Sequence, residues 1–222
     1  MNKKQPTKEE IKLIGIWIEN DLSFEKTIGD LDLPKSLFES FFTKIQDYDY
    51  PALKITAAAP ENIDKIKKNG LHVELVSKNT NFLYISALNL PSFTDGDFQQ
   101  LNSIAPQIAI LDLGDTQVTD SIFKSLPNLP NLTVLKLDNT KVKGKSIGEL
   151  KVLKNLKTIN LSNTDFEENN LVHLKDFKLL NRVFLFNSDI NKSGIETINK
   201  GRTVVEYGNY TLPIIESDSV IY

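Results

Sequence analysis

The second half of the chain repeats one pattern of apolar residues every 24 positions, and this period limits the folds that the chain can adopt. Each copy has an aliphatic residue at positions one, four and six, a hydroxyl-bearing residue at position nine and an apolar residue at position eleven. Four copies in register begin at Ile108, Leu132, Leu156 and Leu180. A fixed period of this length predicts a solenoid, in which every repeat forms one coil and stacks on the next.

The pattern resembles the leucine-rich-repeat consensus, in which a short strand lines the concave side and a helix or turn returns along the convex side. The consensus usually has Asn or Cys directly after the strand, whereas this chain has Thr116, Thr140, Thr164 and Ser188. A hydroxyl oxygen there still bonds the turning backbone of its own coil or of the next one. We therefore predict an α/β leucine-rich-repeat solenoid with parallel strands on the concave face and helices on the convex face.

A fifth, more divergent copy precedes these four. Its strand-like residues 83–88 are followed by residues 93–98, which parallel residues 118–123. Thr94 and Thr119, each followed by Asp, are candidate N-caps of the returning helices. An open solenoid needs a cap at both ends, and we expect these caps before residue 83 and after the last copy.

The chain divides into three regions, a helical segment, an N-terminal cap and the repeats with their C-terminal cap. They are residues 1–50, 51–78 and 79–222. In the first region, Thr7 to Glu10 form a capping-box sequence that opens a helix containing the only Trp, and a second helix is expected from Leu37 to Ile45.

The N-terminal cap is predicted to be a βαβ-like unit, with strands at 52–56 and 72–76 and a helix at 61–68. At the other end of the solenoid, residues 202–207 are expected to form the last strand. The tail beyond them, to Tyr222, is expected to be loose or to lie over the end of the solenoid.

Composition excludes several kinds of chemistry. Without cysteine, the chain has no disulfide, no thiolate metal site and no thiol nucleophile. The 26 Lys and Arg nearly balance the 29 Asp and Glu, and a formal charge of −3 gives no attraction to nucleic acid. No apolar run approaches the ~20 residues that span a bilayer.

No catalytic constellation is evident either. His72 and His173 fall in unrelated parts of the pattern, and neither has a clear Ser or acidic partner. The Gly144-Lys145-Ser146 segment lacks the glycine spacing of a phosphate-binding loop. We therefore expect a protein that is not an enzyme and that has no cofactor and no metal site.

Two further sets of polar residues have structural interpretations. Asp115, Asn139, Asn163 and Asn187 recur once per coil. They are either ligands of a sugar or cation, or turn residues that tolerate unusual backbone angles, and we favour the second because a calcium loop needs several oxygen ligands in one turn. Asp95, Asp97, Glu167 and Glu168 are interpreted as solvated helix starts.

The concave face of such a solenoid carries the variable strand residues. Position three gives the column Ile85, Ile110, Val134, Thr158 and Arg182, and position five gives Ala87, Asp112, Lys136, Asn160 and Phe184. From these columns and Phe186, the predicted binding residues are Ile110, Asp112, Val134, Lys136, Thr158, Asn160, Arg182, Phe184 and Phe186.

Towards the C-terminal coil this face becomes aromatic and basic. Arg182, Phe184 and Phe186 lie close together in the pattern, and aromatic and Arg residues are enriched in protein interfaces. The alternative is that the two Phe side chains pack under the C-terminal tail, since solenoid ends need shielding.

Residues 5–20 resemble the closing helix of the small c-type cytochrome domain in planctomycete-type cytochrome proteins of Bacteroidetes and Planctomycetes. The segments after this helix are similar too: a βαβ-like segment, a divergent repeat like Leu88 to Asp95, and Thr-x-Val-Thr-Asp repeats like Thr116 to Asp120. The resemblance implies a haem domain and membrane segments upstream of the repeats, and a periplasmic or other extracytoplasmic envelope location. The haem-attachment motif is absent here, so the resemblance implies architecture and location but no catalytic residue.

The resulting hypothesis is a non-catalytic binding module that recognises a protein, peptide or other macromolecule through its concave face. A second hypothesis is a structural spacer in a membrane-anchored cytochrome protein. A third is an extracytoplasmic domain that binds or cleaves polysaccharide. A concave face has no chemical signature of its partner, so the sequence does not name one.

Overall fold

The computed structural model of the chain describes residues 8–19, 48–188, 190–191, 194–195 and 203–208. The chain separates into two compact units, residues 1–48 and 49–222. In the first unit, helix α1 (Lys8–Glu19) confirms the helix expected after Thr7. Thr7 itself and the helix expected from Leu37 to Ile45 lie outside the described residues.

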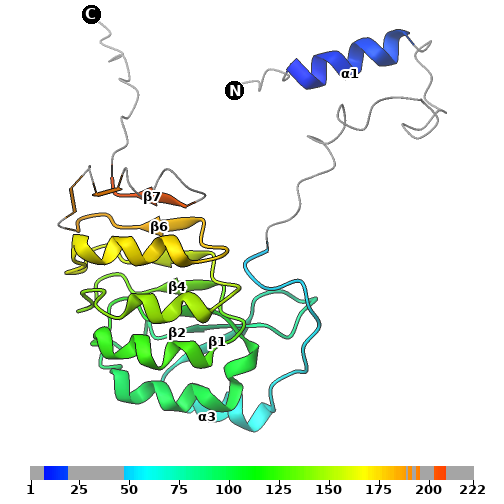
Figure 1. Cartoon of the computed structure of the whole chain (residues 1–222). Coiled ribbons are helices and arrows are strands. Elements are labelled where there is room, and N and C mark those ends of the chain that lie inside the picture. The colour runs from blue at the N-terminus through cyan, green and yellow to red at the C-terminus, as the bar shows by residue number, and fades with distance from the viewer. Residues whose placement is uncertain (1–7, 20–47, 189, 192–193, 196–202, 209–222) are drawn as a thin grey trace, which may run out of the picture. The chain divides into compact units, whose positions relative to one another are not determined.

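Among the described residues of the second unit, seven strands form one sheet, and their order in the sheet follows the chain from β1 to β7 (Figure 1). The strands are β1 (His72–Leu75), β2 (Leu83–Ser86), β3 (Ile108–Asp112), β4 (Val134–Lys136), β5 (Thr158–Asn160), β6 (Arg182–Phe184) and β7 (Val204–Glu206). Strands β2 to β7 run parallel, whereas β1 is antiparallel to β2. Each coil therefore pairs only with the coils before and after it, which confirms the solenoid predicted from the repeat.

The core lies where the aliphatic repeat residues face the neighbouring coils. Leu111 pairs with Leu135, Leu135 with Ile159 and Ile159 with Val183, and all four side chains are completely buried. Burying each of them stabilises the fold by roughly 1.5–3 kcal/mol relative to exposure. Because one coil alone leaves these side chains open to solvent where the neighbouring coils would pack, the stability belongs to the stack.

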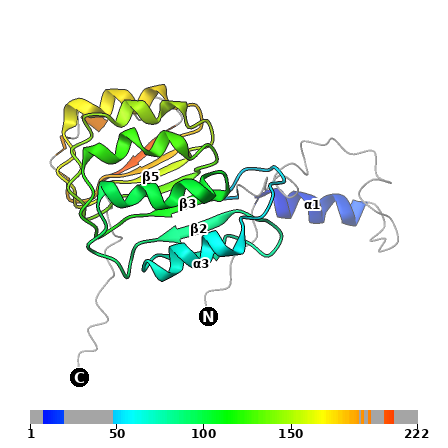
Figure 2. The same ribbon diagram turned by 90° about the horizontal axis from the view of Figure 1, so that it is seen from below.

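The segments that return between strands are helical, as expected, but they form 3₁₀ helices. These are η3 (Asp95–Gln107), η4 (Asp120–Lys124), η5 (Leu126–Asn128), η6 (Ile147–Val152) and η7 (Glu168–Asp176). A 3₁₀ helix advances about 2.0 Å per residue against about 1.5 Å for an α-helix, so fewer residues span the return of a short coil. Figure 2 shows the returns on one side of the sheet.

The predicted N-caps of the returns are confirmed. Thr94 and Asp97 form a reciprocal capping box at the start of η3. At the start of η4, the Thr119 hydroxyl accepts a hydrogen bond from the Ser121 backbone N–H at 3.3 Å. Both caps fix where the chain turns from the strand side to the convex side.

Each coil turns after its strand at a residue with positive φ, as predicted. The four residues are Asp115 (58°), Asn139 (56°), Asn163 (55°) and Asn187 (52°). Asn and Asp adopt this left-handed conformation more readily than other residues with a side chain. The next residue along the chain bonds the turn through its hydroxyl: Thr116 and Thr164 each donate to a carbonyl three residues earlier at 2.7 Å.

The prediction of a βαβ-like cap was wrong. Helix α3 (Pro60–Lys68) and strand β1 form as expected, but residues 52–56 form no strand. Strand β1 pairs with β2 as a hairpin, because the short connection of residues 76–82 cannot make the crossover that parallel strands need. The carbonyls of Ile55 and Thr56 instead accept side-chain hydrogen bonds from Asn81 and Gln107.

Replacing Leu135 by Asp places a charge between two coils, and we expect the second unit to unfold or to lose more than about 3 kcal/mol of stability. The matched control is Leu88→Asp, because the Leu88 side chain is 72% exposed. Urea melts followed by circular dichroism compare the two variants. A loss below about 1 kcal/mol for Leu135→Asp would contradict the assigned position of Leu135 in the core.

Candidate interaction surface

The concave face is the face of the sheet opposite the 3₁₀ helices, and it carries three rows of side chains that cross the strands. The first row is Tyr84, Ile110, Val134, Thr158, Arg182 and Val204, and the second is Ser86, Asp112, Lys136, Asn160, Phe184 and Glu206. The third row, just beyond the strands, is Gly114, Asp138, Ser162 and Phe186. Its register is fixed by backbone N–H groups of Asp115, Asn139 and Asn163, which donate to the carbonyls of Asp138, Ser162 and Phe186.

The structure corrects the first members of both predicted columns. Ile85 and Ala87 face the core and are 0% and 1% exposed, while Tyr84 and Ser86 take their places on the concave face. The register shifts between Leu83 and Tyr84, so that β3 has one more residue than β2 at this point. Side chains alternate along a strand, so a count from Leu83 at the constant repeat spacing assigns the β2 side chains to the wrong face of the sheet.

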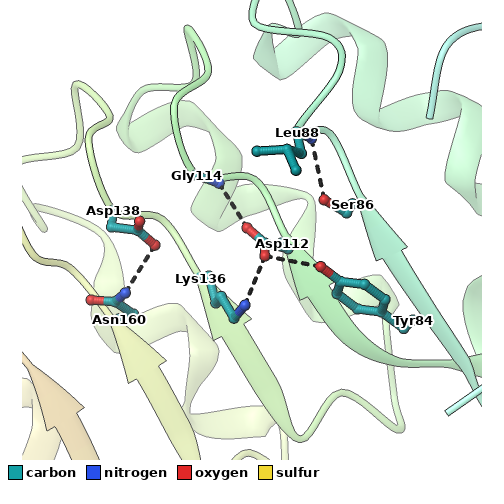
Figure 3. A network of polar contacts seen from close by, with 8 residues as sticks. All are labelled: Tyr84, Ser86, Leu88, Asp112, Gly114, Lys136, Asp138 and Asn160. Carbon is teal, nitrogen blue, oxygen red and sulfur yellow. Dashed lines mark hydrogen bonds and ion pairs between the residues drawn. The ribbon is translucent and has the colours of Figure 1, made fainter. Parts of the chain in front are cut away.

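A hydrogen-bonded network occupies the first coils of the concave face (Figure 3). The Asp112 carboxylate accepts hydrogen bonds from the Tyr84 hydroxyl at 3.1 Å, from Lys136 Nζ at 2.8 Å and from the Gly114 backbone N–H at 3.2 Å. Burial alone would lower the pKa of Lys136. The hydrogen bond and negative charge of Asp112, with smaller contributions from Tyr84 and Asp138, nevertheless raise it above its ordinary value. The negative charge of Asp112 is therefore already balanced by Lys136 and by hydrogen bonds within the chain.

The negative charge of Asp138 is balanced less completely. Its carboxylate accepts a hydrogen bond from the Asn160 side chain at 2.9 Å, and among the described residues it has no ion pair. Partial burial raises the pKa of this carboxyl above its usual value, and the charges of Asp112 and Asp115 add to the rise, although a backbone hydrogen bond and Lys136 oppose it. Gly114 leaves space between the two carboxylates, because a Cβ there would lie 3.2 Å from both Asp138 oxygens.

The last coils present a different surface. The Phe186 side chain is 57% exposed and that of Val204 is 53% exposed, while Phe184 is half-buried beside them. The Phe186 ring lies against the backbone of Gly208, where a Cβ would be 2.7 Å from the ring. Arg182 Nη2 lies 3.8 Å from Asp49 Oδ1, and both side chains are half-exposed. This end of the concave face thus carries Arg182 and aromatic side chains, with the carboxylates of Asp49 and Glu206 nearby.

The segment that enters the second unit runs along the ends of the strands where they begin. The Asp49 carbonyl accepts a hydrogen bond from the Thr133 hydroxyl at 2.5 Å, and the rings of Tyr50 and Phe82 are 6.0 Å apart. Val134 and Thr158, two of the predicted binding residues, are only 8% and 6% exposed. They therefore offer little contact area on the surface.

Three features of this surface were absent from the prediction: Tyr84, Asp49 and the Gly114–Asp138 pair. The third row was accessible to sequence reasoning, because Gly114, Asp138, Ser162 and Phe186 keep the same 24-residue spacing. Tyr84 was missed because of the shifted register. Asp49 carried no sequence signal, since it lies outside the repeats.

The acidic residues at the helix starts do more than face solvent. Asp95 accepts hydrogen bonds from the backbone N–H and hydroxyl of Thr119 at 3.0 and 2.7 Å, so it ties one coil to the next. Glu168 accepts a bond from the backbone N–H of Asn191 at 3.3 Å. The interpretation of these two residues as solvated helix starts was therefore incomplete.

Elsewhere on the described surface, no site with catalytic geometry appears. His173 lines an open polar hollow of about 340 Å³ on the convex side with Lys145 and Asp176, and His72 lies 3.4 Å from the exposed Glu74. Among the described residues, no group of three or more His, Cys, Asp or Glu side chains is placed to hold a metal ion. None of the described helices is long and apolar enough to cross a membrane.

Asp138→Asn should stabilise the protein at neutral pH by less than about 1 kcal/mol, because the site is partly open to solvent. The pKa of Asp138 is raised in the folded state, so stability is lost as pH rises from the unfolded-state pKa through the folded-state pKa. The Asn side chain keeps the bond from Asn160 and has no charge. Urea titrations at pH 3 and pH 7 should show a gain at pH 7 only, and Asp165→Asn, at an exposed residue outside the helices and strands, is the control. A loss of stability at pH 7 would contradict the incomplete compensation of Asp138.

No protein-family model and no curated protein matches the sequence. Among solved structures, the crystal structure of an internalin from Listeria monocytogenes is similar, with a TM-score of 0.37 and 20% sequence identity. The similarity covers 52% of this chain and 38% of the internalin chain, so this chain spans well under half of that protein. At this level the similarity carries no argument about function, and the fold assignment rests on the repeat and the strand register.

Proposed function

We propose that this chain is a non-catalytic recognition module that binds a protein or peptide partner through the concave face. The observation that carries the proposal is the exposed aromatic and cationic cluster of Arg182, Phe184 and Phe186 at the end of that face. Aromatic and Arg side chains are enriched in protein interfaces, where a few residues supply most of the binding energy.

The way these side chains are held also favours binding. Arg182 and Phe184 belong to β6, which is paired on both sides, and Phe186 is supported by Gly208. A partner that covers them therefore removes apolar surface from water without first ordering a loop.

For the cellular setting, we propose a part of a cell-envelope protein of the planctomycete-type cytochrome class, with the haem domain outside this sequence. The support is the resemblance of residues 5–20 and the order of the segments after them. The partner is then a protein of the envelope or another part of the same protein.

A structural spacer is the second candidate, and one observation favours it. The Tyr84, Asp112 and Lys136 side chains satisfy one another, so the first coils of the concave face have few free polar groups to offer a partner. A spacer needs only the stacked coils and would not require the exposed cluster at β6.

Selection from a phage-displayed library of random dodecapeptides distinguishes the two candidates. We expect the full chain to enrich a set of peptides, and the double variant Arg182→Gln/Phe186→Ala to bind the enriched peptides at least tenfold more weakly. The matched control is Lys154→Gln/Val172→Ala, which removes one charge and one exposed apolar side chain from the convex side.

Thermal melts of both double variants verify that each is folded. Enriched peptides that bind the concave variant as well as the wild-type chain would contradict the proposed surface. If the chain enriches no peptide at all, the spacer is favoured and the recognition module is rejected.

A further inference from the structure

Asp49 lies across strand β5. Its carbonyl is bonded to Thr133, which directly precedes β4, and its carboxylate approaches Arg182, which begins β6. Strand β5 lies between β4 and β6, so Asp49 spans Thr158, the first residue of β5. This position explains why Thr158, although in the first row of the concave face, is only 6% exposed.

Two hydrogen-bond donors next to Asp49 lack a good acceptor in the described structure. Thr158 Oγ1 is buried and has no hydrogen-bond partner among the residues that the structure describes. Arg182 Nη2 lies 3.8 Å from Asp49 Oδ1, which is beyond hydrogen-bond distance. A guanidinium and a hydroxyl side by side are donors for a carboxylate, and a buried hydroxyl without an acceptor favours any oxygen that reaches it.

The charges of the concave face restrict an acidic group to this position. Asp112 and Asp138, on the coils of β3 and β4, and Glu206, the register partner of Phe184 on β7, would repel a second carboxylate. Arg182 on β6 attracts one. The half-buried Phe184 lies two residues further along β6 on the same face, which is about 6.6 Å away along the strand.

We propose that the partner presents an acidic residue and an apolar residue two positions apart in an extended segment. The partner's carboxylate displaces Asp49, binds Arg182 and reaches the Thr158 hydroxyl that Asp49 covers, and the partner's apolar side chain covers Phe184. Side chains two positions apart in an extended chain share one face with the same spacing as Arg182 and Phe184. In the free chain, the Asp49 carboxylate lies 3.8 Å from Arg182 and competes with the partner for this guanidinium.

This inference rests on the proposed function, and the probe for it is a phage-displayed library of nine-residue peptides with Phe fixed at the centre. Selection on the full chain should enrich Asp or Glu two positions before or after the Phe. The most enriched peptide is then synthesised with its acidic residue and with the corresponding amide, and both are titrated by fluorescence anisotropy.

The Asp49→Asn variant removes the competitor, and it should bind the acidic peptide about two- to fivefold more tightly while leaving the amide peptide unchanged. Thr158→Val keeps the shape of the side chain without the hydroxyl and should weaken binding of the acidic peptide alone. In the Arg182→Gln background, Asp49→Asn should have no effect. Asp176→Asn, on the exposed convex side, is the charge-matched control.

Two outcomes would overturn the inference, and only one of them leaves the proposed function intact. If peptides bind through Phe184 or Phe186 with no preference for an acidic residue and no response to Asp49→Asn, the proposed function stands and the carboxylate position is rejected. If neither the focused nor the random library is enriched, the recognition surface fails and the inference fails with it.

Discussion

The burial of aliphatic side chains between consecutive coils is the interaction on which the rest of the structure depends. Leu111, Leu135, Ile159 and Val183 are register partners on successive strands, so each strand must lie in register with the next before these side chains are completely buried. A shift by one residue would turn this whole set towards solvent. The same constraint that stabilises the stack therefore aligns the opposite side chains into rows.

Those rows do not form a uniform surface. Over β3 and β4, Lys136 balances the charge of Asp112. Asp138 accepts a hydrogen bond from Asn160 but remains partly buried with a raised pKa. Over β6, an Arg and two Phe side chains remain accessible, and Asp49 reaches across to the Arg from outside the repeats. The face thus differs along the solenoid axis, and its aromatic end around Arg182 keeps exposed side chains that a partner can contact.

Much of the fold could be predicted from the sequence because a 24-residue period states which residues share an environment. The coil order, the positive-φ turns at Asn139 and its equivalents, and the caps at Thr94 and Thr119 all depend on local chemistry. The features that could not be predicted are not periodic. The shift at Leu83 exchanged Ile85 with Tyr84, residues 52–56 form no strand and bind side chains of other segments, and Asp49 reaches Arg182 only through the folded shape.

The register is the claim to test most directly, and a chain without native cysteine suits the test. The double variant Asp112→Cys/Lys136→Cys places two cysteines at register partners of adjacent strands. The control Asp112→Cys/Asn160→Cys places them two strands apart, beyond the reach of a disulfide. Mild oxidation, read by mass spectrometry, should close the first pair and leave the second reduced. Equal closure of both pairs, or closure of the second alone, would contradict the stacked register and with it the recognition surface.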